Sequence, residues 1–331
     1  MKKILLIATG GTIASKDSKT GLKPQLDGNE LLNYLDDIGN FCSISTITLF
    51  NLDSTNINYH HWIMIARCIE ENYEKYDGFV ISHGTDTMAY TSSALSYMIQ
   101  DSRKPIAITG SQKSIFMKDS DARNNLTHAF IYACDDKAHG VNIIFDGKII
   151  LGTRAKKTRT KSFNAFSSVN YPQIGFIQDK KVHYYFNEPL PTENVKFYYK
   201  LNPNIFVLKL FPGIDIKIFD YILLNYDVLI IESFGVGGLP MYYEEDFSSK
   251  IEKLILANKT IIITTQVEKE GSDMSIYQVG KKIKEKYQLL EARDMTTESI
   301  VTKMMWIRGM TSDSEEIKNL FLKPIHSDII L

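Results

Sequence analysis

Three short segments of this chain carry the side chains needed for catalysis by a hydroxyl group. They are Gly10-Gly11-Thr12, Asp53-Ser54-Thr55 and His83-Gly84-Thr85-Asp86, and each follows a segment with the pattern of a strand. A hydroxyl group is a poor nucleophile at its ordinary pKa, so it needs a base or a nearby cation. Lys157 can complete a Thr-Asp-Lys chain when partial burial beside Asp86 leaves its amine neutral or sharing a proton. The residue types alone favour a hydrolase or a transferase.

The first of these segments ends a strand that we expect to be buried on both faces. Five apolar residues, 4–8, stop at a glycine pair that comes too early for a helix. Glycine lets the backbone turn tightly and approach a ligand closely. Taken by itself, the pair fits a phosphate-binding turn or an ordinary loop as well as a nucleophile loop.

Strands and helices alternate along the rest of the chain. Residues 44–50 and 78–82 have the pattern of strands, and apolar spacing predicts a helix over 59–75 between them. This alternation indicates βαβ units and a parallel sheet, whose ligands bind beyond the carboxyl ends of the strands. The three polar segments are therefore expected to meet in one crevice. Further strands are predicted at 105–109, 141–145, 148–151, 205–210, 228–231 and 260–264, and further helices at 28–37, 88–98, 120–134, 214–224, 244–257, 275–287, 300–307 and 314–322.

The length of the chain and its turn signals indicate two α/β domains. A chain of 331 residues is long for a single core, and three prolines cluster with charged residues between positions 189 and 203. We expect an N-terminal domain over 1–188, a linker over 189–204 and a smaller C-terminal domain over 205–331. Each domain is predicted to be a mainly parallel sheet flanked by helices, of the flavodoxin or Rossmann type.

The composition excludes several classes of protein. A net charge of -1 argues against nucleic acid or an anionic membrane as a partner. No stretch reaches the roughly 20 apolar residues of a membrane span, and the first apolar run is too short for a signal peptide. The three cysteines lack the spacing of a disulfide framework or a zinc site, so reduced thiols in a cytoplasmic protein are expected.

Other polar residues have simpler interpretations than catalysis. The side chains of His60 and His61 point in different directions on a helix, which favours a surface or helix-start role over metal binding. His83 is better interpreted as a structural hydrogen-bonding group than as a base. Residues 121–124 are interpreted as helix capping and surface charge, and the basic run at 154–161 as a solvated face. No metal and no cofactor are expected.

The polar segments, taken in order, resemble the bacterial-type L-asparaginases, and in particular their cytoplasmic type I branch. Thr9-Gly10-Gly11-Thr12-Ile13-Ala14 and His83-Gly84-Thr85-Asp86-Thr87 are similar to the two signature motifs of that family. Any one motif could arise by chance, but the ordered set covers nearly the whole chain. The other segments that carry the likeness are 53–55, 109–112, 119–125, Lys157 with 166–170, 234–240 and 294–298.

The resemblance implies an asparaginase-like fold and hydrolysis of L-asparagine to L-aspartate and ammonia without a cofactor, with room for minor glutaminase activity. It also implies a homodimer or homotetramer with the active site at a subunit interface. By motif, Thr12 corresponds to the nucleophile and Thr85, Asp86 and Lys157 to the supporting triad. Ser54 and Asp86 match positions that bind the α-carboxylate and α-amino groups of the substrate. The remaining substrate contacts expected from the resemblance are Gly11, Asp53, Thr55, Gly84 and Ser111.

Three departures from the family pattern affect these expectations. Leu22 stands in the loop 14–27, a predicted lid, where many members have a tyrosine; Tyr277 of a neighbouring subunit is a hypothetical substitute. Glu232 and Val267 stand near the places of an arginine and a cysteine in allosteric members, which puts the usual effector site in doubt. Thr55 replaces a serine or glutamine and is a candidate for changing the asparagine/glutamine preference.

Two alternative functions remain open at the level of sequence. One is the subunit of a tRNA-dependent amidotransferase that releases ammonia from glutamine; such subunits normally carry an extra N-terminal domain, whereas this chain begins directly at its first strand. The other is a catalytically silent sensor of asparagine or aspartate, which the missing tyrosine keeps open.

Overall fold

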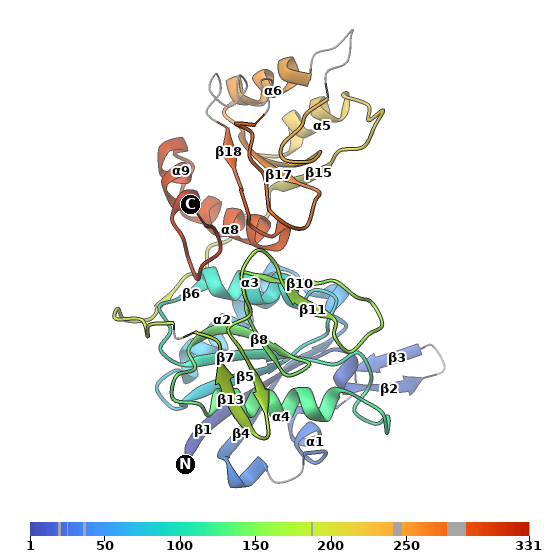
Figure 1. The fold of residues 1–331 in the computed structure, drawn as a ribbon, viewed down its shortest axis with the longest axis vertical. Coiled ribbons are helices and arrows are strands. Elements are labelled where there is room, and N and C mark those ends of the chain that lie inside the picture. The colour runs from blue at the N-terminus through green and yellow to red at the C-terminus, as the bar shows by residue number, and fades with distance from the viewer. Residues whose placement is uncertain are drawn as a thin grey trace. The chain divides into compact units, whose positions relative to one another are not determined.

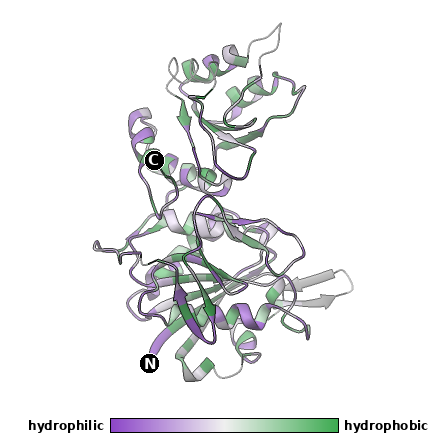
Figure 2. Ribbon diagram, in the orientation of Figure 1, coloured by the Kyte–Doolittle hydropathy of each residue, from purple (hydrophilic) through white to green (hydrophobic). Residues whose placement is uncertain are grey.

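The computed structural model describes residues 1–18, 21–24, 26–35, 38–186, 188–240, 247–276 and 289–330, and for 16–24 and Asn40 it describes the backbone only. The chain divides into two compact units, Met1–Tyr199 and Lys200–Leu331 (Figure 1). The division falls within the segment 189–204 that the sequence suggested as a linker. Hydrophobic residues are concentrated on the central strands of both units (Figure 2).

The first unit is built on one eight-stranded sheet with the order β13-β12-β9-β8-β7-β5-β1-β4. The neighbouring pairs from β4 to β8 are parallel, whereas β9, β12 and β13 are added antiparallel. The strands are β1 (Lys2–Gly10), β4 (Cys42–Leu52), β5 (Gly78–Ser82), β7 (Pro105–Thr109), β8 (Gly140–Phe145), β9 (Lys148–Leu151), β12 (Gly175–Gln178) and β13 (Lys181–Tyr184). The small two-stranded sheets pair β2 (Ser15–Ser18) with β3 (Gly21–Pro24), β10 (Ala155–Lys157) with β11 (Phe166–Ser168), and β6 (Ile99–Gln100) with β14 (Lys196–Phe197).

Helices cover both faces of this large sheet. They are α1 (Gly28–Leu32), α2 (Tyr59–Asn72), α3 (Met88–Met98) and α4 (Ala122–Ala133), with short 3-10 turns η1 (Thr12–Ala14), η2 (Ile38–Asn40) and η3 (Ser54–Asn56). Figure 1 shows α3 on one side of the sheet and α4 on the other. Ile4 and Leu6 of β1 belong to the same apolar cluster as Leu126 and Phe130 of α4. All five residues of 4–8 are buried, so β1 is enclosed on both faces, as predicted.

The second unit has its own sheet and core. Its four strands are all parallel, in the order β15 (Ile205–Lys209), β16 (Val228–Ser233), β17 (Thr260–Thr265) and β18 (Leu290–Glu291). Helices α5 (Ile218–Asn225) and α6 (Phe247–Leu256) meet through the rings of Phe219 and Phe247, whose centroids are 4.8 Å apart. The other described helices are α8 (Thr297–Met310) and α9 (Ser314–Leu322). None of the helices in the described part of the chain is long and apolar enough to cross a bilayer.

The α/β class predicted from the sequence is confirmed, with local corrections. Asp146 and Gly147 form the hairpin between β8 and β9, both with positive φ, as their sequence indicated. The helix predicted over 28–37 is described only over Gly28–Leu32. The segment 14–27, predicted as a loop, contains the antiparallel pair β2–β3. Backbone N–H and C=O groups can form such a pair even where the sequence has no apolar periodicity. The helix predicted over 275–287 lies mostly outside the described residues.

Candidate active site

Glycines bring the three polar segments into contact at the carboxyl ends of β1, β4 and β5. Gly11 has a φ of 82°, and a Cβ atom added to it would lie only 2.4 Å from the backbone nitrogen of Gly84. A Cβ atom on Gly84 would in turn lie 2.6 Å from the Oγ atom of Ser54. The segments can approach this closely only because the positions lack side chains. The crevice expected from the strand order is therefore formed from neighbouring backbone segments.

Thr12 stands at the first position of η1, directly after the glycine pair. The backbone N–H of Gly11 donates to the carbonyl of Leu52 at 2.9 Å, and the Ser15 hydroxyl donates to the carbonyl of Gly11 at 2.9 Å. These bonds hold the turn in place from both sides. The Thr12 side chain is half-buried and makes no hydrogen bond with any residue that the structure describes, so its hydroxyl can engage a bound molecule.

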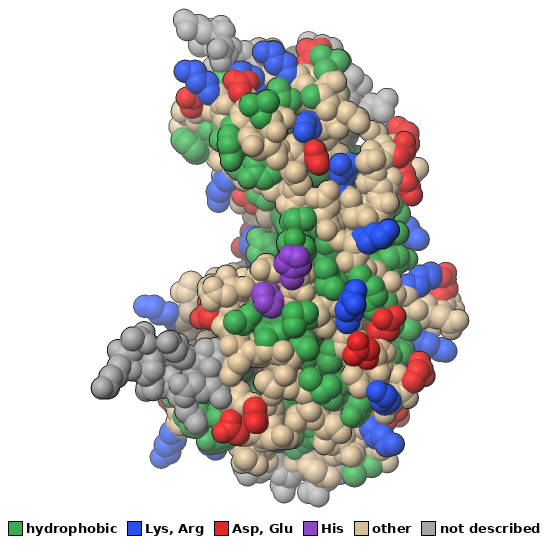
Figure 3. Space-filling model, turned by 180° about the vertical axis from the view of Figure 1, so that it is seen from behind, with side chains coloured by type: hydrophobic (Ala, Val, Ile, Leu, Met, Phe, Trp, Pro, Cys, Tyr) green, Lys and Arg blue, Asp and Glu red, His purple; other side chains and the backbone are tan. Residues whose placement is uncertain are grey.

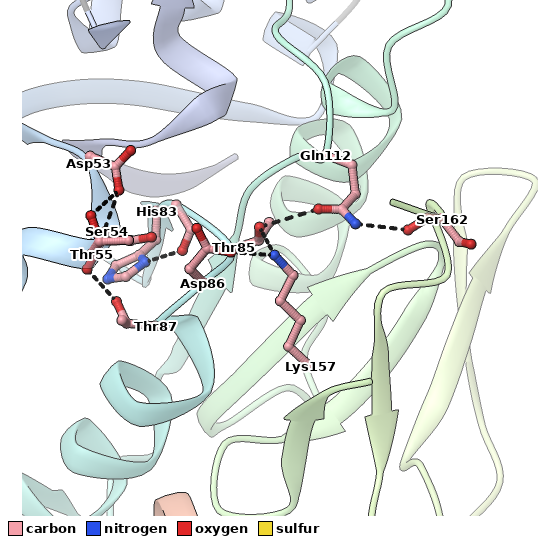
Figure 4. Close-up of polar contacts among 11 residues, drawn as sticks. Asp53, Ser54, Thr55, His83, Thr85, Asp86, Thr87, Gln112, Lys157 and Ser162 are labelled. Atoms are coloured by element: carbon pink, nitrogen blue, oxygen red, sulfur yellow. Dashed lines mark hydrogen bonds and ion pairs between the residues drawn. The ribbon is translucent and has the colours of Figure 1, made fainter. Parts of the chain in front are cut away.

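Lys157 links Thr85 and Asp86, its two predicted partners in the third segment (Figure 4). Its Nζ atom donates to Thr85 Oγ1 at 2.7 Å and to Asp86 Oδ1 at 2.6 Å. The Lys157 side chain is 16% exposed and that of Asp86 is 58% exposed, whereas Thr85 is buried. The β10–β11 hairpin, in which Lys157 pairs with Phe166, carries the lysine to this point. The Thr-Asp-Lys chain expected from the sequence is therefore present as a hydrogen-bonded unit, with Lys157 in the middle. The Asp86 carboxylate at one end of this unit is exposed to solvent.

Gln112 extends this unit on the other side of Thr85. The Thr85 hydroxyl donates to Gln112 Oε1 at 3.3 Å, and Gln112 Nε2 donates to the carbonyl of Ser162 at 3.0 Å. Since a carbonyl can only accept, the contact with Ser162 fixes which end of the carboxamide faces Thr85. The hydroxyl hydrogen of Thr85 then points to Gln112 and an oxygen lone pair faces Lys157. Sequence reasoning missed this role, although Gln112 is adjacent to the predicted Ser111.

Asp121 secures the loop that carries Gln112. Its carboxylate accepts the backbone N–H groups of Gln112 and Lys113 at 3.0–3.1 Å, and the side-chain amide of Asn125 at 3.1 Å. The side chain is buried, and this burial raises the pKa of Asp121. The interpretation of Asp121 as surface charge is therefore wrong, because the loop at 112–113 folds over its carboxylate. It makes no side-chain cap to α4 either.

The second segment forms a local turn around the Asp53 carboxylate. Asp53 Oδ1 accepts from the backbone N–H of Thr55 at 2.9 Å and from its hydroxyl at 2.8 Å. Ser54 is buried, and its carbonyl accepts from the Thr87 hydroxyl at 2.8 Å. Asp53 and Thr55 remain exposed. The turn thus joins the segments after β4 and β5 and leaves Asp53 and Thr55 facing solvent.

His83 is a buried structural group at the end of β5. Its Nδ1 atom donates to the carbonyl of Gly84 at 2.6 Å, and Nε2 lies 2.9 Å from Thr91 Oγ1, which also accepts from Trp62 Nε1 at 3.0 Å. Burial lowers the pKa of His83 to about 4, so the ring is neutral and Nε2 accepts from Thr91. These bonds agree with the structural role suggested by the sequence and tie the Gly84 turn to α2 and α3.

The remaining predicted residues lie as follows. The Ser111 hydroxyl is fully buried and donates to the carbonyl of Lys113, so it is engaged within its own loop. The backbone of Leu22 is part of β3, and Tyr277 lies outside the described residues. In the second unit, Glu232 Oε1 accepts from the Thr297 hydroxyl at 2.7 Å, and Val267 is exposed.

The histidine pair His60-His61 stands at the start of α2, where the Asn58 backbone donates to His61 Nδ1 at 3.1 Å. This is the helix-start role suggested by the sequence. No group of three or more histidine, cysteine or acidic residues suited to a metal occurs among the described residues.

The whole chain is similar to proteins of one known family. The family model of the N-terminal asparaginase domain matches residues 3–190, and that of the glutaminase/asparaginase C-terminal domain matches 204–321. The chain belongs to the asparaginase family. An asparaginase-family relative, the L-asparaginase of Thermococcus kodakarensis, is 36% identical over 330 residues, which cover 99% of both proteins. The family predicted from the sequence motifs is confirmed.

Solved structures of the asparaginase family extend the likeness to the fold. The thermostable L-asparaginase from Thermococcus kodakarensis superposes with a TM-score of 0.93 at 35% identity, covering 99% of each chain. L-asparaginase I from Vibrio cholerae gives a TM-score of 0.87 at 27% identity, covering 100% of this chain and 99% of that one. A glutamyl-tRNA(Gln) amidotransferase component from Methanosphaera stadtmanae is 32% identical and is covered over 74% of its length.

Proposed function

We propose that this protein is an L-asparaginase that hydrolyses L-asparagine to L-aspartate and ammonia through Thr12. The observation that carries the proposal is the Lys157 amine, held at 2.7 Å from Thr85 and 2.6 Å from Asp86. Because Gly11 packs on Gly84, this unit lies beside the turn that presents the Thr12 hydroxyl. A nucleophile and a proton-transfer chain are thus supplied by adjacent loops.

The reaction proceeds in two steps. The Thr12 oxygen attacks the side-chain amide carbon of asparagine. The Thr85 hydroxyl turns from Gln112, passes its own hydrogen to the Lys157 amine and takes up the Thr12 proton, and a proton from this pair then reaches the amide nitrogen, which leaves as ammonia. The resulting ester on Thr12 is then attacked by water, which gives up a proton to the same chain; the ester bond breaks and Thr12 regains its proton. Because the Gly11 N–H already donates to Leu52, other backbone N–H groups beside Thr12 stabilise the oxyanion formed in each step.

The charged ends of the substrate are proposed to bind to polar groups of the crevice. The solvated Asp86 carboxylate suits the α-ammonium group, whereas the Ser54 hydroxyl with nearby backbone N–H groups suits the α-carboxylate. Gln112 is added to the proposed machinery as a positioning residue for Thr85. The other residues proposed to contact the substrate are Gly11, Asp53, Thr55, Gly84 and Ser111.

Ammonia release from asparagine by the wild type and by Thr12→Ala tests the proposal. We expect the wild type to turn over asparagine and Thr12→Ala to lose roughly 10³-fold or more in kcat, since the nucleophile is removed. Near-normal turnover in Thr12→Ala would show that the nucleophile is another residue. A wild type that binds asparagine without releasing ammonia would instead identify a sensor.

A second candidate function is ammonia supply to a glutamyl-tRNA amidation reaction. It is favoured by the 32% identity to the glutamyl-tRNA(Gln) amidotransferase component, a match that spans 96% of this chain. Steady-state kinetics with asparagine and glutamine separate the two functions: an asparaginase has the higher kcat/KM for asparagine, and a dominant preference for glutamine would support the second. We also propose that the protein forms a homodimer or homotetramer with the active site at a subunit interface. Sedimentation equilibrium would measure the size of the oligomer.

A further inference from the structure

A cavity of about 250 Å³ opens in the first unit at the amino end of β8. The catalytic segments follow the carboxyl ends of β1 and β5, which run parallel to β8 through β7. The cavity therefore lies at the opposite end of the sheet from the proposed active site, and no residue of that site lines it. It is lined by Tyr132, His139, Ile174, Tyr184, Glu188 and Leu190, together with the charged residues Asp136 and Lys137.

The walls of this cavity are largely apolar. Tyr132 and Ile174 are buried side chains of the main core, and the partly buried Tyr184 packs against the same core. Leu190 is 43% exposed. A dry cavity of about 150 Å³ is enough to hold a benzene ring. The larger volume here accommodates a ring or short alkyl chain together with one polar group.

The hydroxyl groups of Tyr132 and Tyr184 and the Nδ1 atom of His139 already donate hydrogen bonds within the protein. The Tyr184 hydroxyl donates to Asp135 at 2.8 Å, and the Tyr132 hydroxyl donates to the carbonyl of His139 at 3.5 Å while it accepts from Asn142. His139 Nδ1 donates to the carbonyl of Lys137 at 2.9 Å. The tyrosine and histidine side chains therefore offer acceptors and aromatic faces to a guest. The cation of the lining is Lys137, whose Nζ atom lies 5.9 Å from the centroid of the Tyr184 ring.

Glu188 supplies the strongest of these acceptors. Its carboxyl group is half-buried, and the Tyr171 hydroxyl at 3.3 Å is its one hydrogen-bond donor among the described residues. Burial raises the pKa of Glu188, and the nearby His139 opposes that effect. Lys2 is occupied elsewhere, in an ion pair of 2.7 Å with Asp136. A carboxylate removed from water with one weak donor is stabilised by a cation placed beside it.

We propose that this cavity is a binding site for a small organic amine with an apolar body. The apolar part lies against Tyr132, Ile174 and Tyr184. The ammonium group donates to the Glu188 carboxylate, forming a charge-assisted hydrogen bond. Neutral molecules of the same shape lack that bond, and carboxylic acids meet a like charge.

Calorimetric titration of the full-length protein with benzylamine at neutral pH tests this site. We expect saturable 1:1 binding of benzylamine, at least tenfold weaker binding of benzyl alcohol, and no detectable binding of benzoate. Glu188→Gln should weaken benzylamine binding at least tenfold, whereas Glu74→Gln, on an exposed side chain of the same unit, should leave it unchanged. Asparagine turnover should be unaffected by Glu188→Gln.

Equal binding of benzyl alcohol, an unchanged affinity in Glu188→Gln, or the absence of saturable binding would each overturn the proposal. Leu190→Trp provides a second test that does not alter the carboxylate. Because Leu190 is partly exposed, the variant should fold and block the cavity, so benzylamine binding should be lost. Benzylamine binding that survives both substitutions would place the amine elsewhere on the protein.

Discussion

The orientation of a single hydroxyl group, that of Thr85, depends on a side chain that sequence reasoning did not select. Thr85 lies between the Lys157 amine and the Gln112 carboxamide, and Gln112 is itself oriented by the carbonyl of Ser162. If the carboxamide were absent, the Thr85 hydroxyl could rotate and donate in other directions. In the proposed mechanism, proton transfer between Thr12 and the substrate would then begin from several arrangements instead of one.

Replacing Gln112 should therefore affect the chemical step more than substrate binding. We expect Gln112→Met to lower kcat about tenfold, which corresponds to ~1.4 kcal/mol, and to change KM by less than about twofold. Gln178→Met, an exposed position on β12, is the matched control and should behave as the wild type. Steady-state kinetics on asparagine measure the effect, and an unchanged kcat in Gln112→Met would remove Gln112 from the mechanism.

At the scale of elements, the site depends on how closely two strand-to-helix turns can pack. The turn after β1 touches the turn after β5 through Gly11 and Gly84, and the second turn is tied to α2 and α3 by His83. The geometry of the proposed site is thus set by backbone contact and by a buried hydrogen-bond chain, and not by the proposed catalytic side chains alone.

Gly11→Ala tests the contact between the turns. The new methyl group would meet the Gly84 backbone at 2.4 Å, so the turns must separate. Gly213 is a matched control, since its φ of 85° is nearly that of Gly11 but nothing lies within 4 Å of its Cβ position. Gly213→Ala should cost only the backbone strain of roughly 1–2 kcal/mol and keep full activity. Gly11→Ala should lose more stability in urea unfolding and at least tenfold in kcat; equal effects of the two variants would contradict this account.

The buried His83 should make stability depend on pH. Its folded pKa of about 4 lies below the ordinary histidine pKa of 6.5, so the unfolded chain binds the extra proton between these pH values. Stability should fall as pH decreases from about 6.5 to 4, by up to about 3 kcal/mol from this residue. His83→Gln should lack that part of the pH dependence in urea unfolding. Identical pH profiles for both proteins would show that His83 does not titrate in this way.

On the scale of the whole molecule, the chain consists of two units with separate cores, and charged side chains of both signs are scattered over the face seen in Figure 3. The second unit contains a fully buried ion pair between Lys303 and Asp328. Lys303 Nζ lies 2.7 Å from Asp328 and also donates to the carbonyls of Phe321 and Lys323 at 2.7 and 2.8 Å. Lys303 thereby links α8 to the end of α9 and to the residues that follow it.

Removing one partner of this pair should be costly. Lys303→Met leaves the Asp328 charge buried and two carbonyls without their donor, so we expect a loss of about 3–5 kcal/mol in unfolding free energy. Lys253→Met, at an exposed position of α6, should change it by less than about 0.5 kcal/mol. Chemical denaturation followed by circular dichroism measures both, and similar stabilities for the two variants would argue against a structural role for the pair.

The sequence by itself determined the family, the α/β class and the meeting of three polar segments. It could do so because a buried parallel strand has a recognisable pattern and because parallel strands place their carboxyl ends at one edge of a sheet. The hairpin at Asp146-Gly147 was predictable for a similar local reason, since its turn requires residues that tolerate positive φ.

Only the tertiary structure decided which side chains complete the site. Thr85 meets Lys157 72 positions away and Gln112 27 positions away, and Asp121 became a buried loop anchor instead of a surface charge. Such contacts depend on packing distances of a few ångströms, which residue type and periodicity do not encode. The same holds for the cavity beside Glu188, which is formed by segments distant in sequence and has no motif of its own.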